Sequence, residues 1–136
     1  MDKCELCQPP VYPIVWKNSK FRIIEIDDLS YSAYYRVEHI QHIKEMTDLD
    51  EKERDELMKL VFIVESAIKI FYKPDKINLA SLGNLTPHVH WHVIPRFYDD
   101  NHFPGSIWSE QKKFKKTKIS SQVRKNINSF IIKNLN

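Results

Sequence analysis

Three histidines occupy alternate positions in one short stretch of the sequence. His88, His90 and His92 are separated by Val89 and Trp91, and an imidazole can bind a metal, move a proton or act as a nucleophile. Because successive side chains of a β-strand point to opposite faces, a strand here would present all three imidazoles on one face. Packing offers no reason for three titratable rings in a row, so the pattern indicates a chemical function.

Two kinds of chemistry fit such a row. In metal-dependent enzymes, imidazoles one pleat apart can share an ion. In nucleophilic catalysis, one imidazole attacks an electrophilic phosphorus and a neighbouring imidazole handles the leaving group. The histidines alone are compatible with both.

The only two cysteines form a Cys4-x-x-Cys7 pair near the start of the chain. The sequence shows no secretion signal and no long apolar run, which predicts a cytoplasmic protein without a membrane partner. A permanent disulfide is rare in that compartment, and no βαβ pattern surrounds the pair to suggest a thioredoxin-type site. The pair is therefore interpreted as half of a metal site, with two free thiols as the alternative.

Length and composition narrow the choice further. A chain of 136 residues with 42% hydrophobic and 29% charged residues is typical of one folded domain. Gly83 and Gly105 are its only glycines, so it contains neither a Walker loop nor a dinucleotide-binding fingerprint. The net charge of +3 is unevenly distributed: residues 111–136 hold eight basic and no acidic residues, whereas residues 1–110 carry a net charge of −5. No recognition motif accompanies these lysines, so we interpret them as a solvated linker and expect no nucleic acid partner.

The elements that position these residues follow from periodicity and capping signals. Asp50 is a candidate helix N-cap, apolar residues then recur at three- and four-residue steps, and Pro74 ends the pattern. A second helix is predicted from Ser121. Strands are predicted over residues 14–16, 21–26, 34–37, 77–82 and 88–97. This order predicts an α+β fold with a mostly antiparallel sheet of about five strands, one long helix and a C-terminal helix.

The stretch from His88 to Ile94 is similar to the His-φ-His-φ-His-φ-φ signature, with φ apolar, of the histidine triad (HIT) superfamily of nucleotide hydrolases and transferases. The early cysteine pair, the hairpin, the capped helix and the paired strands also follow in the family's order, so the resemblance covers about residues 4–97. Similarity to a bacterial branch labelled diadenosine tetraphosphate hydrolases lies in residues 45–49, 76–84 and 99–104.

This resemblance implies a HIT-like fold and a division of the chain. A HIT domain would span residues 1–110, and a basic linker and helix over 111–136 would pack on the same domain. Subunits of the family usually pair across a sheet edge and the long helix, which implies a homodimer.

The resemblance also implies catalytic roles. His90 would attack the α-phosphorus of a nucleotide and form a covalent nucleotidyl-imidazole, which water then hydrolyses. A backbone carbonyl near His88 would hold the other nitrogen of His90. His92 would contact the phosphate or the departing oxygen. No organic cofactor is implied.

Some members of the family contain zinc, and the resemblance to them implies which residues would bind the ion together with the two cysteines. By resemblance, Cys4 and Cys7 would bind structural zinc together with His42 and His88. His42 is preferred to His39 because it keeps the family's spacing to the start of the helix. A closed set of four ligands is structural rather than catalytic.

Substrate contacts depart from the family's pattern. The phosphate loop is shortened to residues 83–87, where Asn84 or Thr86 would replace the missing donors. Asp28 is the candidate for holding the ribose, with a simple turn residue as the alternative.

Two aromatic residues follow the predicted histidine strand. A chain leaving that strand must pass close to the site, so Trp108 and Phe103 are predicted to line or cover a nucleotide pocket. The alternative is that both side chains pin the tail onto the body of the domain.

The expected function is a nucleotide hydrolase or nucleotidyl transferase acting at the α-phosphate of a (di)nucleoside phosphate or phosphoramidate. Two alternatives remain: a nucleotide-binding sensor or adaptor with little turnover, made conceivable by the altered phosphate loop, and a metal-dependent hydrolase that uses the histidine row directly.

Overall fold

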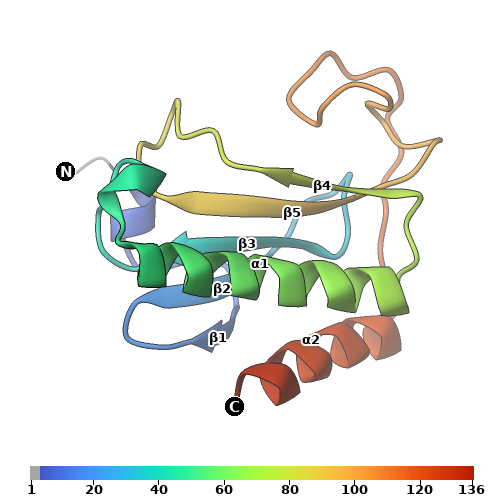
Figure 1. Ribbon diagram of the computed structural model, residues 1–136. Helices are drawn as coiled ribbons and strands as arrows, with labels where there is room; N and C mark the ends of the chain where they lie inside the picture. The colour runs from blue at the N-terminus through green and yellow to red at the C-terminus, as the bar shows by residue number, and fades with distance from the viewer. Residues whose placement is uncertain (1–3) are drawn as a thin grey trace.

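An antiparallel sheet of five strands in the order β1-β2-β3-β5-β4 forms the centre of the computed structural model, which describes residues 4–136. Two helices pack against each other and against one face of this sheet (Figure 1). The strands are β1 (Ile14–Lys17), β2 (Phe21–Ile26), β3 (Tyr34–His39), β4 (Lys76–Ala80) and β5 (His90–Arg96). The helices are α1 (Glu51–Phe71) and α2 (Ser121–Leu135), with single 3₁₀ turns at Glu5–Cys7 and Met46–Asp48. The predicted α+β fold is confirmed.

Strand β5 lies between β3 and β4 and is antiparallel to both. On the helix side of the sheet, Val93 is fully buried and Trp91 is partly buried against the core. His90 and His92 alternate with these residues and therefore lie on the opposite, helix-free face. The predicted strand start at His88 is wrong: β5 begins at His90, because the backbone N–H of His88 turns back to the carbonyl of Thr86 at 2.8 Å.

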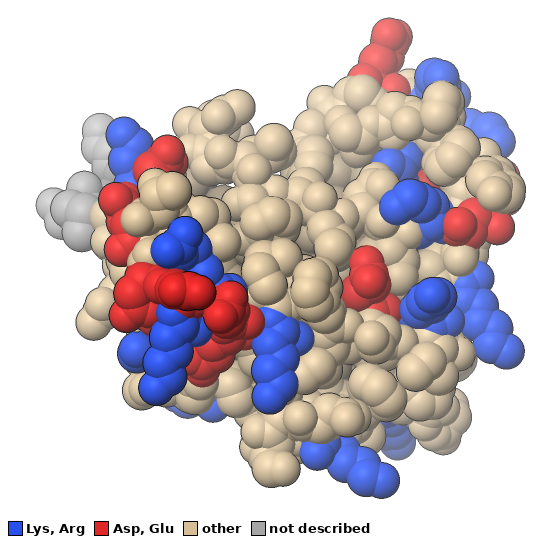
Figure 2. All heavy atoms as spheres, in the orientation of Figure 1, with Lys and Arg blue, Asp and Glu red and all other residues tan. Residues whose placement is uncertain are grey.

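Helix α1 begins and ends where the sequence signals predict. The Asp50 side chain accepts a hydrogen bond from the Glu53 backbone N–H at 2.8 Å and caps the first turn. Six residues face the core from one stripe: Leu57, Leu60, Val61, Val64, Ala67 and Ile68. Acidic and basic side chains lie side by side over the solvent face of its N-terminal end (Figure 2). Neither helix of the described residues combines the length and the apolar character that crossing a bilayer requires.

Helix α2 packs beside α1 and closes the core. Ile127 and Ile131 are fully buried in the same apolar cluster as the α1 stripe. Arg124 forms an ion pair with Glu25 of β2 at 2.6 Å, and Asn128 accepts a hydrogen bond from the Tyr35 hydroxyl at 2.6 Å. These contacts tie the C-terminal helix to the helix side of the sheet.

A buried ion pair fixes the loop that follows β5. Arg96 donates from Nε and Nη2 to the carboxylate of Asp100 at 2.7 and 3.0 Å, and both side chains are less than 5% exposed. Three backbone amides of the same loop also donate to Asp100. Although burial opposes ionisation, these donors hold the pKa of Asp100 well below its usual range. The Tyr31 hydroxyl joins the network through Asp100 and His102.

We expect Asp100→Asn to lower the free energy of unfolding by about 3 to 5 kcal/mol, because the buried Arg96 charge loses its counter-ion. Chemical denaturation measures the change. Asp99→Asn is the matched control, since Asp99 is exposed and its ion pair with Lys115 is screened by solvent. Equal stability of the two variants would contradict the anchoring role of Asp100.

Candidate active site and metal centre

His90 and His92 form a close pair on the helix-free face of β5. Their ring centroids lie 4.9 Å apart at an interplanar angle of 80°. Nδ1 of His90 lies 2.5 Å from the backbone carbonyl of His88, the type of acceptor that the family resemblance implied. Because a carbonyl only accepts, the proton sits on Nδ1 and the lone pair of Nε2 is free. His90 is thereby held in the tautomer that a nucleophile needs.

The electrostatics of the pair favour neutral imidazoles. Burial lowers the pKa of His90, although the bond to the His88 carbonyl opposes this shift. Burial, followed by the charges of His90 and Arg36, lowers the pKa of His92 to about 3. Both rings are therefore uncharged at neutral pH, and a neutral imidazole is the form that attacks phosphorus.

Tyr34 of β3 fixes the orientation of the second ring. Its hydroxyl lies 2.5 Å from Nδ1 of His92 and has no other hydrogen-bond partner within residues 4–136. Burial raises the pKa of Tyr34, so the phenol keeps its proton. A buried O–H without another acceptor donates to Nδ1, which leaves the proton of His92 on Nε2. The pair thus offers a lone pair from His90 and a donor from His92.

Two charged residues of β3 share this face. Arg36 lies opposite His92 and Glu38 opposite His90 in the strand register. Tyr34, Arg36 and Glu38 are not among the residues predicted from the sequence. Their polar character at alternate positions of a strand was the available signal, but which strand they pair with depends on a contact between distant segments.

Four side chains could hold a metal ion at the edge of this site. The donor atoms of Cys4, Cys7, His42 and His88 all lie within 4.8 Å of one another. The Nδ1 atom of His88 is 3.5 Å from the sulfur of Cys4 and 3.6 Å from that of Cys7, and the Nδ1 atom of His42 is 3.2 Å from Cys7. Tetrahedral zinc with ordinary bond lengths keeps a sulfur and a nitrogen about 3.5 Å apart. The donor set fits such an ion.

Hydrogen bonds around the cluster support this arrangement. Nε2 of His88 donates to the carbonyl of His39 at 2.6 Å, which leaves Nδ1 free as a ligand. The ring of His39 is used elsewhere: its nitrogens meet the Glu53 carboxylate at 3.2 Å and the Gln41 backbone N–H at 3.0 Å. The geometry thus favours His42 over His39, in agreement with the sequence-based preference.

The loop before β5 holds both predicted phosphate donors. Gly83 adopts a φ of +71°, a turn conformation that favours glycine. Asn84 is exposed, and Thr86 is partly buried with its carbonyl engaged by the His88 backbone. No contact within the described residues links either side chain to His90 or His92, so their role stays a prediction.

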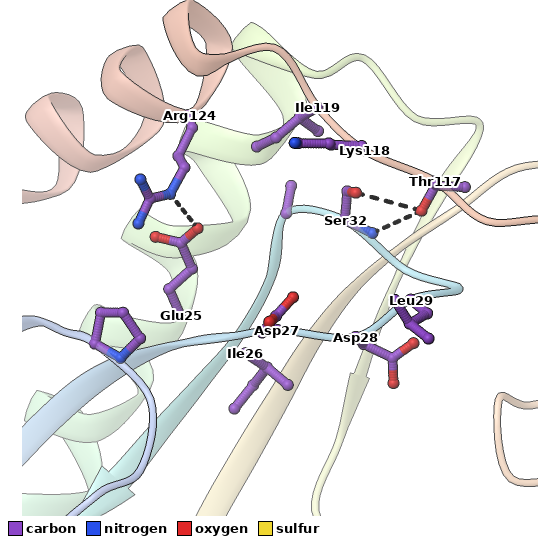
Figure 3. A pocket seen from close by; sticks show the side chains of 12 residues that line it. Glu25, Ile26, Asp27, Asp28, Leu29, Ser32, Thr117, Lys118, Ile119 and Arg124 are labelled. Atoms are coloured by element: carbon purple, nitrogen blue, oxygen red, sulfur yellow. Dashed lines mark hydrogen bonds and ion pairs between the residues drawn. The ribbon is translucent and has the colours of Figure 1, made fainter.

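Asp28 lies at the end of β2, in the wall of an open cavity of about 530 Å³ (Figure 3). Its carboxylate accepts from the backbone N–H groups of Ser30 and Tyr31 at 2.8 and 3.2 Å, as a turn residue does. No histidine of the row lines this cavity. The structure shows the turn role, and the ribose role stays a prediction.

The two predicted aromatic residues have different places. The Trp108 ring meets His92 edge to face, with centroids 4.9 Å apart, and is half exposed. Phe103 packs against Tyr98 at 5.2 Å and lies under the guanidinium of Arg96. Trp108 therefore flanks the histidine pair, whereas the contacts of Phe103 are those of the packing alternative.

Comparisons with known proteins agree on one family. The model described as the HIT domain matches residues 13–99. A histidine triad protein from Bradyrhizobium japonicum is 26% identical, with a TM-score of 0.72, over 90% of this chain and 89% of that one. A histidine triad protein from Marinobacter aquaeolei is 18% identical, with a TM-score of 0.72, over 92% and 91%. A histidine triad family protein from Mycobacterium smegmatis, described as zinc-bound, is 16% identical, with a TM-score of 0.65, over 98% and 96%. A search of curated sequences gave no match.

We expect His92 to remain neutral at pH 5, where a free imidazole is protonated, because burial lowers its pKa to about 3. Below about pH 6.5 the His92 imidazole is protonated in the unfolded chain but neutral in the folded chain. Lowering the pH therefore lowers the free energy of unfolding. Long-range ¹H–¹⁵N NMR spectra across pH 4 to 8 measure the titration. A His92 midpoint near 6.5 would contradict the burial argument.

The same spectra test the hydrogen bond from Tyr34. Wild type should show His92 protonated on Nε2, and Tyr34→Phe should yield a mixture of tautomers. Tyr35→Phe is the control, because the Tyr35 hydroxyl faces Asn128 on the helix side.

Proposed function

The chain belongs to the HIT domain family, and from this membership we propose that it hydrolyses or transfers the nucleotidyl group of a (di)nucleoside phosphate or phosphoramidate. The family is one of nucleotide-binding proteins and nucleotide hydrolases. The proposal for this chain rests on one observation: the His88 carbonyl holds the Nδ1 proton of His90, and Nε2 is left with a free lone pair.

The proposed reaction has two displacements at the same phosphorus. Nε2 of His90 forms a bond to the α-phosphorus while the bond from phosphorus to the leaving group breaks. The Nε2 proton of His92 stabilises the departing atom by a hydrogen bond, and the His88 carbonyl stabilises the positive charge of the substituted imidazole. Water then attacks the phosphorus, the phosphorus–nitrogen bond breaks, and one water proton passes to solvent or to the departed group.

The geometry favours this mechanism over a metal-dependent hydrolase that uses the histidine row. His88 is the only histidine of the row in the donor cluster found within residues 4–136, and its other cluster members are Cys4, Cys7 and His42. Nδ1 of His90 and Nδ1 of His92 are each engaged in a hydrogen bond, and Nε2 of His92 carries a proton, so the pair offers one free lone pair rather than the two that a shared ion would need. The retained nucleophile geometry likewise favours turnover over a sensor or adaptor.

We further propose that the cluster binds one structural zinc ion. Four protein ligands leave no open position for chemistry, and the ion would join the N-terminal turn to the chain just before β5. Two free cysteines used in this way fit a cytoplasmic location.

A homodimer is the proposed assembly. Strand β4 is an edge of the sheet next to β5, and helix α1 exposes Phe62. Pairing of these surfaces between two copies would continue the sheet and cover the exposed ring.

We expect His90→Asn to lower turnover of dinucleoside polyphosphates, adenosine phosphoramidates or nucleotide sugars by roughly a thousandfold or more, because the nucleophile is removed. Nucleotide affinity should be retained, and an acid-labile, base-stable nucleotidyl label should disappear. Lys133→Gln, an exposed change on α2, is the control and should keep the label. Full turnover in His90→Asn would refute the assignment.

We expect about one zinc ion per chain to co-purify, and Cys4→Ser to lower both zinc content and melting temperature. Elemental analysis and thermal unfolding measure these changes. A chelator should abolish activity only as the fold is lost. Immediate loss of activity with an intact fold would instead indicate metal-dependent hydrolysis, and metal-free active protein would exclude the zinc proposal.

A further inference from the structure

Arg36 is an accessible positive charge beside the histidine pair. Residues directly opposite each other in an antiparallel pair share one face, with Cβ atoms about 5 Å apart, and Arg36 lies opposite His92 in this way. Its side chain leans toward Glu38, which lies opposite His90. The guanidinium is thus positioned along the side of both rings.

The charges around Arg36 do not balance. The buried carboxylate of Glu38 accepts a hydrogen bond from Nε of Arg22 at 2.7 Å and another from Nε of Arg36. No other acid forms an ion pair with either arginine within residues 4–136. Two guanidiniums therefore share one carboxylate, and one positive charge is left over on the helix-free face.

The two arginines differ in what their terminal nitrogens do. Arg22 points inward, with 10% of its side chain exposed, and donates from Nη2 to the carbonyl of Leu6 at 2.7 Å. Arg36 is 22% exposed, and within residues 4–136 neither of its terminal nitrogens has a hydrogen-bond partner. Glu38 holds Arg36 in place through Nε and leaves the other N–H groups available as a fork of donors.

We infer that Arg36 is a substrate-binding residue that receives the phosphoryl group attacked by His90. A phosphate oxygen pair matches the planar donor fork, and a phosphate dianion or diester would neutralise the unbalanced charge. This inference rests on the proposed function. It also explains how a chain with a shortened phosphate loop gains anion affinity: the donors come from a central strand of the sheet, at a position fixed by backbone pairing.

The test compares ligands that differ only by the phosphate. Isothermal titration calorimetry gives the dissociation constants of AMP and adenosine, and of GMP, CMP and UMP with their nucleosides, for wild type and Arg36→Gln. We expect wild type to bind the best monophosphate more tightly than its nucleoside, and Arg36→Gln to reduce this ratio about tenfold or more without weakening the nucleoside. Arg36→Lys should restore part of the ratio. Glu38 keeps Arg22 as its partner in the variant, so the fold should persist.

Arg54→Gln is the matched control, because it removes the same charge from the exposed surface of α1 on the helix side of the sheet and should leave the ratio unchanged. If the wild-type protein has no higher affinity for any monophosphate than for its nucleoside, the proposed function itself is overturned. An unchanged ratio in Arg36→Gln, with wild type preferring the monophosphate, would overturn only the role of Arg36. Equal loss of monophosphate and nucleoside affinity would do the same, since it indicates a structural role.

Discussion

Backbone hydrogen bonds between β3 and β5 place Tyr34, Arg36 and Glu38 on the same face as His90 and His92. Side chains alternate with a period of two, so a slip of one residue would turn the β3 residues toward the helices and apolar residues toward the histidines. The tautomer of His92 and the charge beside the pair therefore both depend on this register. Burial of Val37 on the other face makes such a slip costly, because a polar side chain of β3 would take its place in the core.

The sequence was informative wherever the signal is local. The Asp50 cap, the apolar stripe of α1 and the alternation in β5 depend on near neighbours, and the structure confirms them. The strand start at His88 was wrong because the His88 backbone N–H donates to the Thr86 carbonyl and does not join the sheet. Arg36 was missed because its role depends on a partner strand more than fifty residues away in the chain.

The histidine face also depends on the segments outside the sheet. The buried network of Arg96 and Asp100 fixes the start of the loop that carries Trp108 to His92. The sequence does not reveal this network. An arginine and an aspartate four residues apart are usually an exposed pair of little importance, and only the structure shows that Arg96 and Asp100 are buried. The buried ion pair thus lies at the start of the loop whose Trp108 ring borders His92.

The bond from Arg22 to the Leu6 carbonyl has a consequence for the boundaries of the functional unit. Leu6 lies between the two cysteines, and Arg22 shares Glu38 with Arg36, so a continuous chain of polar contacts runs from the N-terminal turn to the histidine face. The matched family region begins only at residue 13. A fragment cut at that boundary would retain every histidine of the row, yet it would lack the Leu6 carbonyl to which Arg22 donates. The polar contacts that reach the histidine face therefore begin before residue 13, outside the matched region.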